Sequence, residues 1–321
     1  PPPRLVPGGT VAATTSVQRQ TRRRRWTRWS TVALFVLPAL VLYALFVLLP
    51  IAQAGFYSLF KWNGLKPLTD FVGLANYERA LSDPVFLGAI SHNFFIILLS
   101  LAIQIPFALG LALLLNRDFP GRAVLRLLFF APYVIAEVIA GIVFKLMLTP
   151  DGLVDQSLEA AGLGSLTQLW LADPDFVMYT MFFIISWKYF GFHMIIMLAG
   201  LQEIPREVEE AALVDGASRN QSVRHITIPL LGPTIRVSVF LSIIGALQLF
   251  DLVWATTKGG PINASNTMAT YMIDWGLRRS QLGYGSATAV ILFILAFIVA
   301  LLYQRFVMRQ DVEGATSGGP R

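Results

Sequence analysis

Long apolar segments without the alternation of a strand dominate this chain. Three of them, residues 31–55, 84–116 and 282–304, contain no Asp, Glu, Lys or Arg. A helix of about 20 apolar residues crosses the hydrocarbon layer of a bilayer. Each of these segments is therefore long enough to be a transmembrane helix.

Three further segments, 127–148, 176–202 and 229–254, are equally apolar but carry one or two ionisable residues each. Backbone groups in lipid must be hydrogen-bonded within the protein, and these segments lack the alternation of a barrel strand. We therefore predict an all-α membrane protein with six transmembrane helices. This domain covers residues 31–308. We predict a disordered basic tail at 1–30 and a second, short tail at 309–321.

The composition agrees with a membrane protein, because 55% of the 321 residues are hydrophobic and only 14% are charged. Cysteine is absent, which excludes disulfides and thiolate metal sites. The net charge of +6 could suggest nucleic-acid binding, but the basic residues concentrate in loops beside the apolar segments. We attribute them to membrane orientation and expect no nucleic-acid partner.

The basic residues also predict the orientation, because cytoplasmic loops retain Lys and Arg. Seven arginines precede the first apolar segment, whereas the loop 149–175 has five carboxylates and no cation. We expect both termini in the cytoplasm and this loop outside. The arginines, the apolar run and Ala52-Gln53-Ala54 also fit a cleavable signal peptide. The run exceeds the roughly 7 to 15 residues of a signal core, so we favour a retained helix.

The loop after the fourth predicted helix reads LQEIPREVEEAALVDGASRNQSVRHITIPLLGP and predicts two short helices. Pro205 fits the first position of one helix, and Gly216 fits a left-handed turn at its end. Ser218 and Gln221 form a capping box for the next helix, which Pro229 is expected to bend.

The first of these helices carries only a small apolar stripe, Val208, Ala211 and Ala212, among acidic residues. Such a stripe is too slight to anchor in lipid. It is better suited to a groove on another protein.

The loop resembles the EAA loop of ABC importer permeases. Glu210-Ala211-Ala212, Gly216 and Ile226-x-Ile228-Pro229 carry the resemblance, and Ile228 stands where the family pattern has Leu. The resemblance implies a type I ABC importer permease fold and a coupling helix that lodges in a cytoplasmic ATPase. The residues implied in this coupling are Glu207, Glu210, Ala211, Ala212, Asp215 and Gly216.

Two more stretches resemble the carbohydrate importers, in particular the maltose-type first permease of a heterodimeric pair. One is FVLPALVLYALFVLLP with WNG, FVGLANYERAL and DPVF after it, and the other is TKGGP at 257–261. The resemblance covers residues 35–303. It implies an outer loop at Gly259, Gly260 and Pro261, and a location in the cytoplasmic membrane of a bacterium or archaeon.

The same resemblance implies an assembly: a second permease subunit, two ATPase subunits that bind ATP and Mg, and an extracytoplasmic sugar-binding protein. Transport would proceed by alternating access. The loops 149–175 and 256–283 are the candidate docking surface for the binding protein.

The chain shows no enzyme motif. The phosphate loop G-x-x-x-x-G-K-[ST] is absent, as are H-E-x-x-H and G-x-S-x-G. His92, His193 and His225 are too scattered to suggest a metal site. We therefore expect a transport subunit that binds no cofactor itself.

A sugar site needs hydrogen-bonding side chains and aromatic faces. The fourth and fifth helices supply both, and the candidates are Trp187, Lys188, Tyr189, His193, Gln248, Phe250 and Asp251. Ser238, Ser242 and Gly245 form a small stripe that favours helix packing.

Charges inside a membrane usually have a function, which marks Glu137, Lys145, Lys188 and Asp251. Lys188 could bind an anionic substrate or pair with an acid, and we favour pairing. Lys145 and Asp251 could equally snorkel to the membrane surface.

The predicted function is a permease subunit for a mono-, di- or oligosaccharide. One alternative is a glycerol-phosphate or polyol permease, which should carry more cavity cations than Lys188. A second is an ATP-independent secondary transporter, which typically shows inverted repeats and has no need of a coupling loop.

Overall fold

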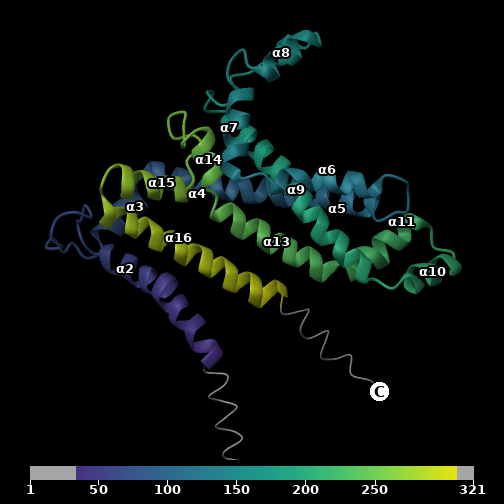
Figure 1. The fold of residues 1–321 in the computed structure, drawn as a ribbon, viewed down its shortest axis with the longest axis horizontal. Coiled ribbons are helices and arrows are strands. Elements are labelled where there is room, and N and C mark those ends of the chain that lie inside the picture. Colours follow the sequence, from purple (N-terminus) through teal and green to yellow (C-terminus); the bar gives the residue numbers. More distant parts are fainter. Residues whose placement is uncertain (1–33, 309–321) are drawn as a thin grey trace, which may run out of the picture. The chain divides into compact units, whose positions relative to one another are not determined.

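A computed structural model describes residues 34–308, and this part of the chain is helical apart from an isolated bridge between Phe60 and Phe71 (Figure 1). The tails predicted at 1–30 and 309–321 lie outside the described residues. The chain forms two compact units, Pro1–Phe56 and Tyr57–Arg321, and each is described by itself.

Four helices are long and apolar enough to cross a membrane: Leu34–Tyr57, Pro84–Leu115, Val177–Glu203 and Leu282–Met308. Two further pairs reach the required length only together. Arg122–Val134 and Glu137–Met147 are bent by 94°, and Arg219–Leu230 and Gly232–Leu247 are bent by 65°. The all-helical prediction is confirmed, with four to six candidate crossings. Two of the three ion-bearing segments are therefore broken: the bend expected near Pro229 lies at residue 231, whereas the break at 135–136 was not predicted.

The crossing helices are assembled from regular and π-helical pieces. The described part of the first unit contains the π turn η1 (Ala44–Leu48) and the start of α2 (Leu49–Tyr57). In the second unit the crossing elements are α4 (Pro84–Leu99), η2 (Ser100–Gln104), α5 (Ile105–Leu115), α6 (Arg122–Val134), α7 (Glu137–Met147), α9 (Val177–Glu203), α13 (Gly232–Leu247), α16 (Leu282–Tyr303) and η6 (Gln304–Met308).

Three of the π turns end two residues before a proline. Pro50 follows η1, Pro106 follows η2, and Pro229 follows η4 (Val223–Thr227). Proline lacks the amide hydrogen, and its ring collides with the carbonyl four residues earlier. A π turn is a local widening of the helix that often marks functional sites. Proline therefore accounts for these three departures from regular helix geometry, whereas η6 (Gln304–Met308) has no proline beside it.

Short helices connect the crossing elements. They are α3 (Ala75–Ser82), α8 (Leu153–Ala160), the 3-10 turn η3 (Gly164–Leu166), α10 (Arg206–Val214), α11 (Arg219–Ser222), α12 (Ile228–Leu230), α14 (Asp251–Thr256), α15 (Met268–Ile273) and the π turn η5 (Asp274–Arg278). Within the second unit, α10 and α11 lie at one end, and α3 and α15 lie at the opposite end (Figure 1).

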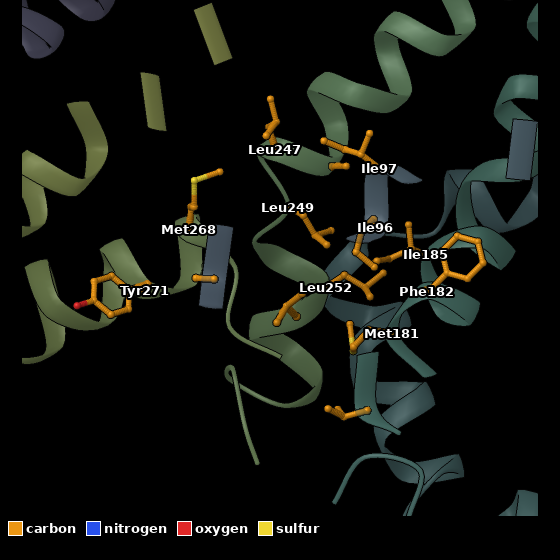
Figure 2. Close-up of a cluster of buried hydrophobic side chains, with 14 of the residues drawn as sticks. Ile96, Ile97, Met181, Phe182, Ile185, Leu247, Leu249, Leu252, Met268 and Tyr271 are labelled. Atoms are coloured by element: carbon orange, nitrogen blue, oxygen red, sulfur yellow. The ribbon is translucent and has the colours of Figure 1, made fainter. Parts of the chain in front are cut away.

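The main hydrophobic core of the second unit joins α4, α9, α14 and α15. Figure 2 shows Ile96, Met181, Ile185, Leu252 and Met268 converging from these helices. A second cluster, built on Ala108 of α5, Met194 and Leu198 of α9, and Leu231, packs nearer the end that carries α10. Both cores are centred on α9, which has the most buried residues of any described helix.

Buried polar groups fix α4 against its neighbours. The fully buried Asn93 donates to the Ala246 carbonyl at 2.6 Å and accepts from the Met268 amide at 2.9 Å. Asp83 caps α4 through the Val85 amide and accepts the Tyr271 hydroxyl at 2.6 Å. Burial raises the pKa of the Tyr271 phenol, and its hydrogen bond to Asp83 raises it further. The phenol therefore stays a donor.

Gly191 permits the close crossing of α6 and α9, because a Cβ at this position would lie 1.9 Å from the Phe129 carbonyl oxygen. We expect Gly191→Ala to separate the two helices, at a cost of about 1 to 3 kcal/mol. The midpoint of thermal unfolding in detergent should fall by several degrees. Gly110→Ala, where an added Cβ meets nothing within 4 Å, is the matched control. Equal midpoints for the two variants would contradict this account of the crossing.

Candidate functional site

A cavity of about 310 Å³ lies inside the second unit. Its polar lining comes from Ser100, Gln104, Tyr133, Glu137, Tyr189, His193, Ser242, Gln248 and Asp251, and Phe192 and Phe250 add aromatic faces. This volume falls at the lower end of the range usual for small-molecule sites. The polar positions concentrate where three helices are interrupted.

The first interruption is the π turn η2 between α4 and α5. Ser100 and Gln104 lie at its two ends, both are buried, and both line the cavity. Gln104 is only 3% exposed, and its Nε2 has no hydrogen-bond partner among the described residues. A buried donor without a partner costs about 1 to 3 kcal/mol. This amide is therefore available to a molecule in the cavity.

The second interruption separates α6 from α7. Ile135 and Ala136 are extended, so carbonyls near the end of α6 have no helical partner. Lys188 of α9 supplies the donor: its ammonium bonds the Ile135 carbonyl and the Tyr133 carbonyl, the latter at 3.3 Å. Glu137 then begins α7 and accepts the Tyr189 hydroxyl.

The third interruption separates α13 from α14. Gln248 ends α13, Asp251 begins α14, and Phe250 between them stacks on Trp254 with ring centroids 5.4 Å apart. Gln248, Phe250 and Asp251 all line the cavity. The break thus brings an amide, a ring and a carboxyl group to one wall.

His193 joins α9 to α13 at the cavity. Its Nδ1 lies 2.7 Å from the Ser238 hydroxyl, and both side chains are buried. Ser242 and Gly245, one and two turns later, reach the cavity wall. The stripe of small residues that was predicted to pack between helices thus has two roles. Ser238 is hydrogen-bonded to His193 of α9, whereas Ser242 and Gly245 line the cavity.

Five of the seven residues predicted for the substrate pathway come together here, namely Tyr189, His193, Gln248, Phe250 and Asp251. Trp187 packs against Phe144 instead, with centroids 4.9 Å apart. Lys188 is buried but does not line the cavity, and its hydrogen bonds go to backbone carbonyls. Of the preferred pairing with an acid, the structure has an electrostatic interaction with Glu137 of α7 but no direct hydrogen bond. Contact with a substrate remains a prediction for the five.

Sequence reasoning missed Ser100 and Gln104 and gave Glu137 no specific role. A signal for Gln104 was present, since it is an amide in a segment without charges and stands two residues before Pro106. Lys145, by contrast, is exposed.

The predicted coupling loop forms the two expected helices. α10 begins at Arg206, one residue later than predicted, so Pro205 is the N-cap and not the first helical residue. Gly216 has φ +88°, as expected for a left-handed turn. The Ala217 and Gly216 amides bond the Ala212 and Leu213 carbonyls at 3.0 and 3.1 Å, which is a Schellman motif.

The second helix of this loop is capped and bent as predicted. Ser218 and Gln221 form the capping box of α11. The bend before α13 lies at Leu231, two residues after Pro229.

The residues predicted for coupling lie largely on the outside of α10. Glu207, Glu210, Ala211, Asp215 and Gly216 are exposed, whereas Ala212 is buried against its own chain. The exposed acids leave this face free to bind another protein.

Two polar contacts fasten α10 to the crossing helices. Glu209 accepts the Thr227 hydroxyl of η4 at 3.0 Å. Asp118, in the loop after α5, bonds Arg122 and lies 3.9 Å from Arg206. The first contact joins α10 to η4, and the second is a surface contact beside the ends of α5 and α6.

The loop with Gly259, Gly260 and Pro261 is closed on itself. Gly259 has φ +89°, and a Cβ there would lie 1.8 Å from Asn266 Oδ1. The Ser265 hydroxyl donates to the Gly260 carbonyl at 2.5 Å. Among the described residues, no group of three His, Cys, Asp or Glu could hold a metal ion.

Residues 104–312 match the family model described as "Binding-protein-dependent transport system inner membrane component". The chain is 34% identical over 297 residues to the sulfoquinovosyl glycerol transport system permease protein SmoG of Agrobacterium fabrum, covering 89% of this chain and 95% of that protein. It is 31% identical over 271 residues to the trehalose/maltose transport system permease protein MalF of Thermococcus litoralis, covering 84% and 91%.

The fold also resembles a crystal structure of a bacterial alginate ABC transporter in complex with an alginate pentasaccharide-bound periplasmic protein. The TM-score is 0.77 and the sequence identity is 22%. The match covers 90% of this chain and 96% of the alginate transporter chain. The chain belongs to the binding-protein-dependent inner membrane component family, among the sugar-type ABC permeases. It is a transport subunit and not an enzyme, and in this family the ATPase is a separate subunit.

The bond between Lys188 and the broken helix can be tested by mutation. Lys188→Met should leave the carbonyls of Tyr133 and Ile135 without their donor, at a cost of about 1 to 3 kcal/mol. The unfolding midpoint in detergent should fall by several degrees. Lys145→Met, which removes an exposed lysine of α7, should leave the midpoint unchanged. A Lys188→Met protein as stable as this control would show that the carbonyls find another donor.

Proposed function

We propose that this chain forms half of the translocation pathway of an ATP-driven sugar importer and carries a mono-, di- or oligosaccharide by alternating access. It crosses the membrane six times, with both broken helix pairs counted as spans and both termini in the cytoplasm. The observation that carries the proposal is the 310 Å³ cavity, whose wall combines rings with amide, hydroxyl and carboxyl groups. Sugars need both, because their hydroxyl groups require partners and their C–H faces stack on rings.

The arrangement of the loops supports the proposed orientation. α10 and α11 lie at the end of the second unit opposite α3 and α15 (Figure 1). Cytoplasmic loops retain cations, and the segment from Arg206 to Arg224 carries three arginines, whereas 149–175 carries none. We therefore propose that α10 lies in the cytoplasm and the loop 149–175 outside. α15 is proposed to lie outside with the Gly259–Pro261 turn because it is at the end opposite α10 and not because of charge, since the loop 256–283 carries Lys258, Arg278 and Arg279.

The proposed partners follow from this arrangement. Two ATPase subunits bind ATP and Mg at the cytoplasmic face, and one of them receives α10. A second permease completes the cavity, and an extracytoplasmic sugar-binding protein docks on the loops 149–175 and 256–283. The related fold in complex with a periplasmic protein supports the last partner. The assembly resides in the cytoplasmic membrane of a bacterium or archaeon.

The proposed mechanism runs from α10 to the cavity wall through contacts already described. Closure of the ATPase pair on ATP moves α10. The hydrogen bond between Glu209 and Thr227 passes this movement to η4, and the chain continues through the bend at Leu231 into α13. Ser242 and Gly245 of α13 line the cavity. A loaded binding protein favours the outward-open state through contacts made only in that state.

The coupling role predicts the behaviour of two variants in the complete assembly, reconstituted with its binding protein and sugar. Glu210→Lys reverses an exposed charge on α10 and should lower sugar-stimulated ATPase activity at least about tenfold. Gly216→Pro cannot adopt φ +88° and should have the same effect, whereas Gly216→Asn tolerates the left-handed turn and should retain most of the stimulation.

Membrane insertion and assembly should be preserved in all three variants. Glu78→Lys, the same reversal at an exposed site on α3 outside both docking loops, is the matched control for charge. If Glu210→Lys and Gly216→Pro supported wild-type stimulation, α10 would not be the coupling element.

A further inference from the structure

The ionisable lining of the cavity is acidic. Among the described residues that form its wall, Glu137 and Asp251 are carboxylic acids, His193 bonds Ser238, and no lysine or arginine is present. Glu137 is held in place by the Tyr189 hydroxyl. A ligand in this cavity therefore meets two carboxyl acceptors, at the starts of α7 and α14.

The buried cation near the cavity is occupied by the backbone. Lys188 is 3% exposed, does not line the cavity, and bonds the carbonyls of Tyr133 and Ile135. Using it for a ligand would leave those carbonyls without a donor inside the membrane, which is costly. Lys188 is thus a structural cation and not a receptor for anions.

The donor that the cavity does offer is uncharged. Gln104 Nε2 is buried without a partner, and Ser100 lies one turn before it on the same wall. An amide N–H can donate to a sugar hydroxyl and so replace the hydrogen bond that water gives this hydroxyl in solution. It gives a carboxylate only one neutral hydrogen bond, which is weaker than a bond from Arg or Lys.

From these three observations we propose that the cavity selects uncharged sugars and rejects uronic acids, with Glu137 as the specificity-determining residue and Gln104 as a substrate-binding donor. This inference rests on the proposed function. The hydroxyl groups of a neutral sugar donate to Glu137 and Asp251 and accept from Gln104. The carboxylate of a uronic acid would instead face two like charges on the wall itself, whereas the ammonium of Lys188, which interacts electrostatically with Glu137, lies behind the wall and gives the ligand no hydrogen bond.

The test uses the complete permease–ATPase assembly in nanodiscs, without ATP or binding protein, and saturation-transfer difference NMR. The probes are glucose and glucuronate, galactose and galacturonate, and mannose and mannuronate, each pair at equal concentration. In the wild type, the neutral member of at least one pair should bind about tenfold better than its uronate.

Three variants separate charge from structure. Glu137→Gln keeps an acceptor for the Tyr189 hydroxyl and should reduce the preference for the neutral sugar about tenfold, whereas Glu137→Asp should retain that preference. Gln104→Leu should weaken binding of the neutral sugar about fivefold or more. Glu78→Gln, at an exposed site on α3, should change neither quantity.

Two results would overturn the inference while sparing the proposed function: uronates that bind the wild type as well as the neutral sugars do, or a preference that Glu137→Gln leaves unchanged. An unaltered affinity in Gln104→Leu would remove Gln104 from the site. If no sugar of any pair bound the wild type, the proposed function itself would fail, and this inference with it.

Discussion

The site depends on how the chain satisfies its backbone where a membrane helix is broken. In lipid, a carbonyl without a donor is costly, so an interruption survives only if another part of the protein supplies the hydrogen bond. At the end of α6 the ammonium of Lys188 supplies it. That bond allows the chain to turn by 94°, and Glu137 and Tyr189 meet at the cavity as a result.

This use of Lys188 also decides which ionisable groups reach the cavity wall. A cation committed to backbone carbonyls is removed from the wall, and the wall retains two carboxylic acids and an unpartnered amide. The same breaks matter for movement. The bend at Leu231 joins the loop that carries α10 to α13, and the interruption at 248–250 ends that helix at the cavity. The breaks that shape the site are therefore also the points through which the proposed movement would pass.

Much of the fold could be predicted because apolar length and turn chemistry are local properties. The six apolar segments, the left-handed Gly216 and the capping box of Ser218 all follow from neighbouring residues, and the structure agrees with them. The breaks were harder to predict, because Leu127–Leu148 is apolar enough for a straight helix and only Lys188, about 50 residues later, makes its interruption tolerable. The hydrogen bonds of Lys188 were missed for the same reason, because backbone carbonyls freed by a break cannot be predicted from composition. Five cavity residues on α9 and beside α14 were identifiable by chemistry, whereas Gln104 required knowledge of the π turn before Pro106.

A structure of the assembled transporter with its sugar bound would test the central claim most directly. The account predicts sugar density in the cavity, within hydrogen-bonding distance of Gln104 and Glu137, and α10 seated on an ATPase subunit at the cytoplasmic face. Sugar held elsewhere, with this cavity closed in every state of the cycle, would contradict it. So would an α10 that touches no other subunit.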